Sequence, residues 1–116
     1  GQMAPTTLLG QVTTTSPYGR SKDREGYPAQ MAELLSVNRG SAYICRTAVN
    51  NPANVTKTKK AIKKAFETQQ KGLGFTMVEV LSTCPTNWGL SPVEAMKWVE
   101  EKMVPYYPLG EFKTPE

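Results

Sequence analysis

The sequence predicts an α/β fold, and within that class the carboxyl-terminal half of a doubly wound parallel sheet preceded by a long irregular segment. Residues 41–81 contain a β-rich run, an amphipathic helical run and a second β-rich run, which is the order of a right-handed parallel crossover. Two parallel strands alone make a poor sheet, because parallel sheets need helices on both faces and further strands at their edges. With 116 residues, the chain is therefore expected to be a single partial domain spanning residues 1–116.

Residues 1–27 are expected to be irregular, because they show neither the period of a strand nor that of a helix. They include five threonines, four glycines and two prolines. Ordered loops of this length are usually lids or binding segments, and disorder is the alternative. Residues 28–116 are the part in which helices and strands are expected, in the order α-β-α-β-α.

The first helix and the first strand are expected directly after the irregular segment. A helix over 28–38 is predicted by a proline at its first position, by apolar residues at helical spacing and by the stop signal Asn-Arg-Gly at 38–40. The run 41–49 is short, rich in β-branched and aromatic residues, and bounded by turn-forming residues. We therefore expect a strand there.

A long amphipathic helix is predicted over 52–71, with an apolar face toward the sheet and a basic face toward solvent. The apolar face is expected to contain Val55, Ile62, Ala65, Phe66 and Gln69. The basic face is expected to contain Lys57, Lys60, Lys63, Lys64 and Lys71. A charged helix face is usually a solvated one, and binding of a phosphate-rich ligand or an acidic protein is the alternative.

The second strand and the third helix complete the predicted order. Residues 75–81 follow a Gly-Leu-Gly break and are mostly apolar, which is typical of a buried parallel strand. After a loop, a helix is predicted over 91–103. Its start is marked by Ser91 as N-cap, a proline at the first helical position and Glu94, which closes a capping box.

Composition excludes several classes of site. The chain has no histidine and a single aspartate, Asp23, so its own residues cannot form a Ser/His/Asp triad, a histidine zinc site or an Asp-rich calcium loop. A net charge of +4 is well short of the basic stripe typical of nucleic-acid binding, so no nucleic-acid partner is expected. Neither a membrane span nor a signal peptide is recognisable, and we expect a cytoplasmic protein with no membrane partner.

The two cysteines are the candidate reactive side chains. Ligands in doubly wound folds lie beyond the carboxyl ends of the strands, which directs attention to residues 47–51 and 82–89. Cys84 lies in the second of these segments and is followed by a proline that restricts the local backbone, which makes it the leading candidate. Cys45 lies inside a strand. A buried, unreactive thiol is the alternative for Cys84 and the favoured interpretation of Cys45.

Four segments resemble a known family. They are Gly-Gln-Met-Ala-Pro-Thr-Thr-Leu-Leu-Gly-Gln at 1–11, Thr-Thr-Thr-Ser-Pro-Tyr-Gly at 13–19, Tyr-Ile-Cys-Arg-Thr at 43–47 and Glu-Val-Leu-Ser-Thr-Cys-Pro-Thr-Asn-Trp-Gly at 79–89. They are similar to β subunits of 2-oxoacid:ferredoxin oxidoreductases, of the short-subunit type that acts on 2-oxoglutarate or branched-chain 2-oxoacids. The resemblance covers most of the chain.

The resemblance implies a thiamine-diphosphate-binding domain in a multisubunit enzyme. Such an enzyme decarboxylates a 2-oxoacid on thiamine diphosphate, passes electrons through iron-sulfur clusters to ferredoxin and transfers the acyl group to coenzyme A. The implied partners are the α subunit, the other subunits, ferredoxin, coenzyme A and the 2-oxoacid. Residues 1–27 would lie next to the cofactor, and the chain alone is expected to be inactive.

The resemblance also assigns roles to individual residues. Cys84 matches the fourth cysteine ligand of a [4Fe–4S] cluster, whose other three cysteines are expected to precede Gly1. Gln2 and Thr6 match positions that line the thiamine and substrate cavity. The Gly-Asp-Gly motif and the asparagine that bind magnesium and the diphosphate are likewise expected upstream. No residue of this chain is assigned a catalytic role.

Two alternative functions belong to other classes. A noncatalytic scaffold subunit would share the family's sequence without its cofactor. A basic binding module would use the lysines of 52–71 on an acidic protein or a nucleic acid. Single-strand binding needs aromatic side chains among the lysines, and Phe66, the nearest one, is expected on the apolar face.

Overall fold

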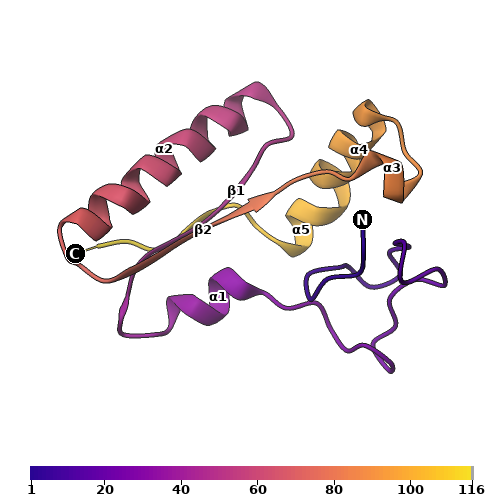
Figure 1. The fold of residues 1–116 in the computed structure, drawn as a ribbon, viewed down its shortest axis with the longest axis horizontal. Helices are drawn as coiled ribbons and strands as arrows, with labels where there is room; N and C mark the ends of the chain where they lie inside the picture. Colours follow the sequence, from indigo (N-terminus) through magenta and orange to yellow (C-terminus); the bar gives the residue numbers. More distant parts are fainter. Residues whose placement is uncertain (116) are drawn as a thin grey trace.

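The computed structural model describes residues 1–115, which form a three-stranded sheet with helices on both faces and an irregular amino-terminal segment beside one end (Figure 1). The strands are β1 Ser41–Ala48, β2 Phe75–Leu81 and β3 Gly110–Lys113. Their order is β2-β1-β3, so the fully buried β1 lies in the centre. The α/β prediction is confirmed, and the arrangement is that of a fragment of a parallel-sheet fold.

The pairing of the strands confirms the predicted crossover and adds one strand. Strands β1 and β2 are parallel, from Ser41 opposite Phe75 to Ala48 opposite Leu81. Strand β3 pairs with the other edge of β1 in the antiparallel direction. It was not predicted, because four residues with a glycine at the start carry too little periodicity to indicate a strand.

The three predicted helices are present with altered boundaries, and two short helices that were not predicted, at 85–88 and 104–106, are added. They are α1 Met31–Ser36, α2 Pro52–Gln70, α3 Pro85–Trp88, α4 Pro92–Trp98, the π-helical turn η1 Val99–Met103 and α5 Val104–Tyr106. Helix α1 is shorter than the predicted 28–38, since Pro28 lies before it. The capping box of Ser91 and Glu94 is present at α4, but the helical path bulges at η1 and continues past 103. None of the helices in the described part of the chain is long and apolar enough to cross a bilayer.

The predicted apolar face of α2 is wrong for Ile62 and Phe66 and right for Ala65, which packs against the core cluster beneath the helix. Thr58, Ala61 and Thr68 are the buried residues of this helix, whereas Ile62 and Phe66 are exposed. The hydroxyls of the two threonines bond to helix carbonyls, and Thr58 also donates to Ala48 of β1, so small polar residues fill the contact. Small side chains therefore form the contact with the sheet, while Ile62 and Phe66 face outward.

One lysine was also placed on the wrong face. Lys64 is half-buried against the sheet: its Nζ lies 2.8 Å from Glu111 Oε2 of β3 and 5.0 Å from the centre of the Tyr43 ring. The expectation that Lys64 belongs to a solvated face is therefore corrected. Lys57 and Lys60 are exposed, as predicted.

The core consists of two separate clusters on the two faces of the sheet. One contains Ala48, Leu81, Val99 and Tyr107, and it joins the strands to the carboxyl-terminal helices. The other contains Tyr43, Cys45 and Ala61 and lies beneath α2. The first cluster is the one that supports the carboxyl end of β2, where the candidate site lies.

The outer edge of β2 has no neighbouring strand among residues 1–115. Phe75 is 50% exposed and Val80 is 38% exposed, although the sequence predicts a buried strand. The exposed Ile62 and Phe66 of α2 line a groove with Thr76 and Val78 along the same edge. Exposed edge strands usually carry a lysine or a proline that prevents pairing with another strand. Strand β2 contains neither residue. An unprotected apolar edge is what an interior strand shows when its neighbour is missing.

Residues 1–27 are irregular, as predicted, and they are ordered around one buried arginine. The guanidinium group of Arg20, with five N–H donors, lies within hydrogen-bond distance of six backbone carbonyls. These carbonyls belong to Ala4, Pro5, Thr7, Glu25, Gly26 and Tyr27. Isolated bridges join Leu9 to Arg20 and Thr13 to Ser16. Arg20 thus holds the first residues of the chain against the loop that leads into α1.

Candidate functional site

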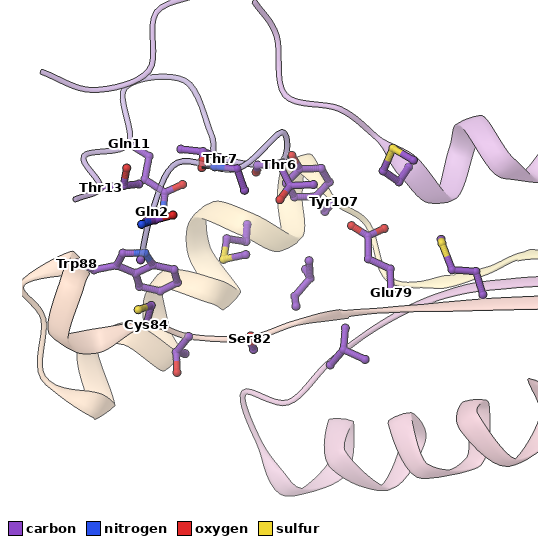
Figure 2. Close-up of a pocket in the computed structure, with 18 residues that line it drawn as sticks. Gln2, Thr6, Thr7, Gln11, Thr13, Glu79, Ser82, Cys84, Trp88 and Tyr107 are labelled. Atoms are coloured by element: carbon purple, nitrogen blue, oxygen red, sulfur yellow. Dashed lines mark hydrogen bonds between the residues drawn. The ribbon is translucent and has the colours of Figure 1, made fainter. Parts of the chain in front are cut away.

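A cavity of about 600 Å³ lies where the irregular segment meets the carboxyl end of β2 and the carboxyl-terminal helices. Figure 2 shows Gln2, Thr6, Gln11 and Thr13 on the side formed by the irregular segment, with Cys84 and Trp88 on the side that follows β2. This is the edge at which doubly wound folds place their ligands.

The structure brings the three sequence-predicted site residues together. Gln2, Thr6 and Cys84 all line this one cavity, although Cys84 is far from the other two in the sequence. Among the described residues, the cavity therefore collects every position that the family resemblance assigned to a cofactor or a metal.

Cys84 is held at the start of a short helix. It is the N-cap residue of α3, and Pro85 occupies the first helical position, which restricts the backbone at the thiol. The Asn87 side-chain amide donates to Cys84 Sγ over 3.5 Å. This contact favours the thiolate, the form that binds metals.

Thr6 is positioned through the backbone of the segment that contains it. The Tyr107 hydroxyl donates to the Thr6 carbonyl over 2.8 Å, and Arg20 donates to carbonyls on both sides of Thr6. Burial raises the pKa of Tyr107 to about 12, so its hydroxyl stays protonated and remains a donor. Tyr107, directly after α5, thus holds this cavity wall from the carboxyl-terminal part of the chain, and Arg20 holds it from within the irregular segment.

Further polar residues on the same wall were not singled out from the sequence. These residues are Thr7, Gln11 and Thr13, which all line the cavity. The Gln11 side chain accepts a hydrogen bond from the Leu8 amide, and the Thr7 hydroxyl accepts one from the Ala4 amide. These contacts are local to the segment. The many threonines and glutamines of the irregular segment were the available signal for a polar cavity wall. The sequence does not specify which of these side chains face the cavity.

The floor of the cavity is one face of β2. Met77, Glu79 and Leu81 recur at the two-residue period of a strand, and all three line the cavity. Glu79 is directly opposite Arg46 in the β1–β2 register, and Arg46 Nε donates to Glu79 Oε2 over 3.1 Å. Two charged residues in otherwise apolar strands were the available signal for this pair, and the sequence analysis did not use it.

Arg46 is the centre of a buried ionic group. Its guanidinium has no exposed surface and also lies 2.6 Å from Glu33 Oε1 of α1. The rings of Tyr107 and Phe112 each lie 5.0 Å from the guanidinium carbon. Glu79 is thus fixed by an arginine that is itself enclosed by α1, β3 and the end of α5.

Cys45 lies elsewhere, in agreement with its predicted role as a packed thiol. It faces a second cavity of about 350 Å³ beneath α2, lined also by Lys57, Lys60 and Lys64. Burial raises the pKa of the Cys45 thiol, which favours the neutral form. The two cysteines therefore do not face a common ligand.

The donor set of the described residues fits one ligand position of a metal cluster. No group of three or more His, Cys, Asp or Glu side chains is arranged to hold a metal ion within residues 1–115. A [4Fe–4S] cluster needs about four thiolate ligands. Cys84 fits one of them, while a complete cluster site and a magnesium site would need residues outside this chain.

Comparison with curated proteins finds similar segments in 2-oxoacid oxidoreductase subunits. Ketoisovalerate oxidoreductase subunit VorA of Methanothermobacter marburgensis is 42% identical over 113 residues, which are 97% of this chain and 24% of the relative. 2-Oxoglutarate synthase subunit KorB of the same organism is 34% identical over 109 residues, which are 90% of this chain and 34% of the relative.

A third relative is named after a different 2-oxoacid, pyruvate. Pyruvate synthase subunit PorB of Pyrococcus furiosus is 33% identical over 93 residues, which are 80% of this chain and 26% of the relative. No family model matches the chain. No solved structure matches it. The match is thus to the 2-oxoacid oxidoreductase family, and the chain spans about a quarter to a third of the relatives' length.

Proposed function

We propose that this chain is part of the thiamine-diphosphate-binding β subunit of a 2-oxoacid:ferredoxin oxidoreductase. The complete enzyme would convert a 2-oxoacid to its acyl-CoA with reduction of ferredoxin. The observation that carries this proposal is the convergence of Gln2, Thr6 and Cys84 on one cavity at the carboxyl end of β2. The similarity to three kinds of 2-oxoacid oxidoreductase subunit supports it independently.

The irregular segment would form one wall of the cofactor and substrate cavity. Thiamine diphosphate, when bound, supplies the carbanion chemistry of decarboxylation. The side chains of Gln2 and Thr6 present an amide and a hydroxyl, which can hydrogen-bond a ring nitrogen or a carboxylate without bringing a charge. Arg20 and Tyr107 keep this wall in place by holding its carbonyls.

Cys84 would supply one thiolate to a [4Fe–4S] cluster beside that cavity. Its fixed backbone directs Sγ toward the cavity, and Asn87 can donate a hydrogen bond to the bound sulfur. Trp88 lines the cavity next to it, with its ring 6.3 Å from that of Trp98. This pair of rings would limit the access of water to the metal-bound sulfur, which is one way in which proteins adjust a reduction potential.

The remaining parts of the site would come from other residues and other subunits. The described residues hold no group of three or more His, Cys, Asp or Glu side chains that could bind a metal ion, and one of their two cysteines lines the cavity. The magnesium site, the diphosphate site and three cysteines would be supplied from elsewhere in the protein. The α subunit, ferredoxin, coenzyme A and the 2-oxoacid are the proposed partners. The chain alone would therefore be inactive.

Replacement of each cysteine in the intact multisubunit protein tests this function. Cys84→Ser should lower the iron content by about one cluster and abolish reduction of ferredoxin, because a serine oxygen is a poor substitute for a thiolate on iron. Cys45→Ser is the matched control, and it should retain both iron and electron transfer. Full iron content and full ferredoxin reduction in Cys84→Ser, or loss of iron in Cys45→Ser instead, would contradict the proposal.

A further inference from the structure

We propose that the cavity beneath α2 binds a dianionic phosphate group, and that Lys57 and Lys60 are its principal ligands. The group would be inorganic phosphate or the phosphate of a small ester. This cavity shares no lining residue with the one that contains Cys84. The inference therefore goes beyond the proposed function and does not depend on it.

Three lysines of α2 converge on this one cavity. Lys57, Lys60 and Lys64 follow one another at intervals of three and four residues, which places them on one face of the helix. All three line the cavity of about 350 Å³, whereas Lys59 and Lys63 of the same helix lie outside it. Positive charge is thus gathered at one concave place and is not spread evenly around the helix.

The side of the cavity opposite the helix provides one negative charge, and that charge is already paired. Glu111 of β3 lines the cavity, and its Oε2 lies 2.8 Å from Lys64 Nζ. The hydrogen bond from Lys64 lowers the pKa of Glu111, so the carboxyl group stays ionised beside its lysine. Arg46 also lines the cavity, but its side chain has no exposed surface. Lys57 and Lys60 are therefore the charges that a ligand in the cavity would meet.

The floor of the cavity is one face of β1, and it adds no further charge. Tyr43, Cys45 and Thr47 recur at the two-residue period of a strand, and all three line the cavity. Burial raises the pKa of the Tyr43 phenol and of the Cys45 thiol, so both groups stay neutral at neutral pH. An anion held by the two lysines would therefore lie above a floor without competing negative charge.

A phosphate dianion matches this cavity in charge and in size. A phosphate monoester carries about two negative charges at neutral pH, which balance the charges of Lys57 and Lys60. Lysine ammonium groups donate charge-assisted hydrogen bonds to phosphate oxygens. A cavity of about 350 Å³ is at the small end of ligand pockets, which span about 300–1,000 Å³, so it suits a phosphate with few carbon atoms. The bound anion would also remove the repulsion between two like charges on one helix face.

Calorimetric titration of the intact multisubunit protein with inorganic phosphate tests the proposal. The wild-type protein should bind phosphate with a Kd below about 1 mM. The double variant with Lys57→Gln and Lys60→Gln should bind it at least about tenfold more weakly, because two charge-assisted contacts are lost. A melting curve establishes that the variant is folded.

A matched double variant controls for the loss of two charges. Lys59→Gln combined with Lys63→Gln changes two exposed lysines of the same helix that lie outside the cavity. Its Kd should stay within about twofold of the wild-type value, because charges exposed to solvent are screened. Phosphate sites elsewhere in the protein are the same in both double variants, so the difference between the variants reports on this cavity alone.

A second titration, with glycerol 3-phosphate, identifies the source of the phosphate group. Tighter binding than that of inorganic phosphate supports an ester as the ligand, and equal or weaker binding supports free phosphate. The proposal is overturned if the wild-type protein binds neither compound up to about 10 mM. It is also overturned if the folded variant of Lys57 and Lys60 binds phosphate as tightly as the variant of Lys59 and Lys63. Because binding is measured without turnover, neither result bears on the proposed oxidoreductase function.

Discussion

The irregular segment and the sheet are stabilised in different ways, although both form walls of the same cavity. The sheet region is held by apolar packing, with Ala48, Leu81, Val99 and Tyr107 in one buried cluster. The irregular segment has no buried apolar cluster within residues 1–27. Its order depends on Arg20, whose guanidinium bonds carbonyls at both ends of the segment. Tyr18 and Tyr27 are exposed there.

This difference explains which wall can change without loss of the fold. Apolar packing is distributed over many contacts, so the end of β2 presents Leu81 and Cys84 on a rigid support. The opposite wall depends on a few polar contacts and can open locally without unfolding the sheet. We expect substitutions in the sheet to lower global stability and substitutions in the segment to alter the cavity.

The largest effect on stability is expected from Arg46→Ala. The substitution leaves Glu33 and Glu79 without their buried cation, and removal of one partner of a buried ion pair costs about 3–5 kcal/mol. Chemical unfolding of the chain should show this loss as a lower free energy of unfolding. Arg39→Ala, at an exposed position, should change it by less than about 0.5 kcal/mol. Equal effects of the two substitutions would contradict the central role of Arg46.

A smaller effect on global stability, with a large local one, is expected from Arg20→Ala. Five of the six carbonyl contacts are part-buried and one, to Thr7, is buried, so most of the carbonyls that lose their donor can be hydrated. The free energy of unfolding should therefore fall by about 1–2 kcal/mol. Amide hydrogen exchange should accelerate over residues 4–27 and remain slow in β1. Unchanged exchange in the segment would show that other contacts order it.

The smallest effect is expected from Lys64→Ala, and it should depend on pH. Lys64 lowers the pKa of Glu111, so the pair contributes stability above the ordinary carboxyl pKa and loses it as pH falls through the lowered value. Because both side chains are about 40% exposed, the contribution at neutral pH should be below about 1 kcal/mol. Unfolding of Lys64→Ala and wild type should be measured from about pH 7 to about pH 2, where the difference should shrink. A difference that grows on acidification would contradict the pairing.

The regular elements could be predicted because their signals are local. The capping box at Ser91, the proline and asparagine at the start of α2, and the apolar runs of β1 and β2 depend on neighbouring residues alone. The inward face of α2 could not be predicted in this way. Thr58 and Thr68 are buried because their hydroxyls bond helix carbonyls and fit close to the strands, which only the tertiary contact determines.

The candidate site was predicted in part. Cys84 could be singled out by its position after a strand, and Gln2 and Thr6 by the family resemblance, and all three line the cavity. The supporting residues could not be found from the sequence, because each acts across a long separation. Tyr107 contacts Thr6, and Arg46 contacts Glu33 and Glu79, through the tertiary fold. The cofactor roles of the three residues remain predictions.

The position of iron relative to this cavity tests the account most directly. Crystals of the intact multisubunit protein should be measured at the iron absorption edge, so that anomalous scattering locates the metal. We predict an iron cluster bound to Cys84 Sγ, with Gln2 and Thr6 facing thiamine diphosphate across the same cavity. Iron bound away from Cys84, or a cofactor that contacts neither Gln2 nor Thr6, would contradict the account.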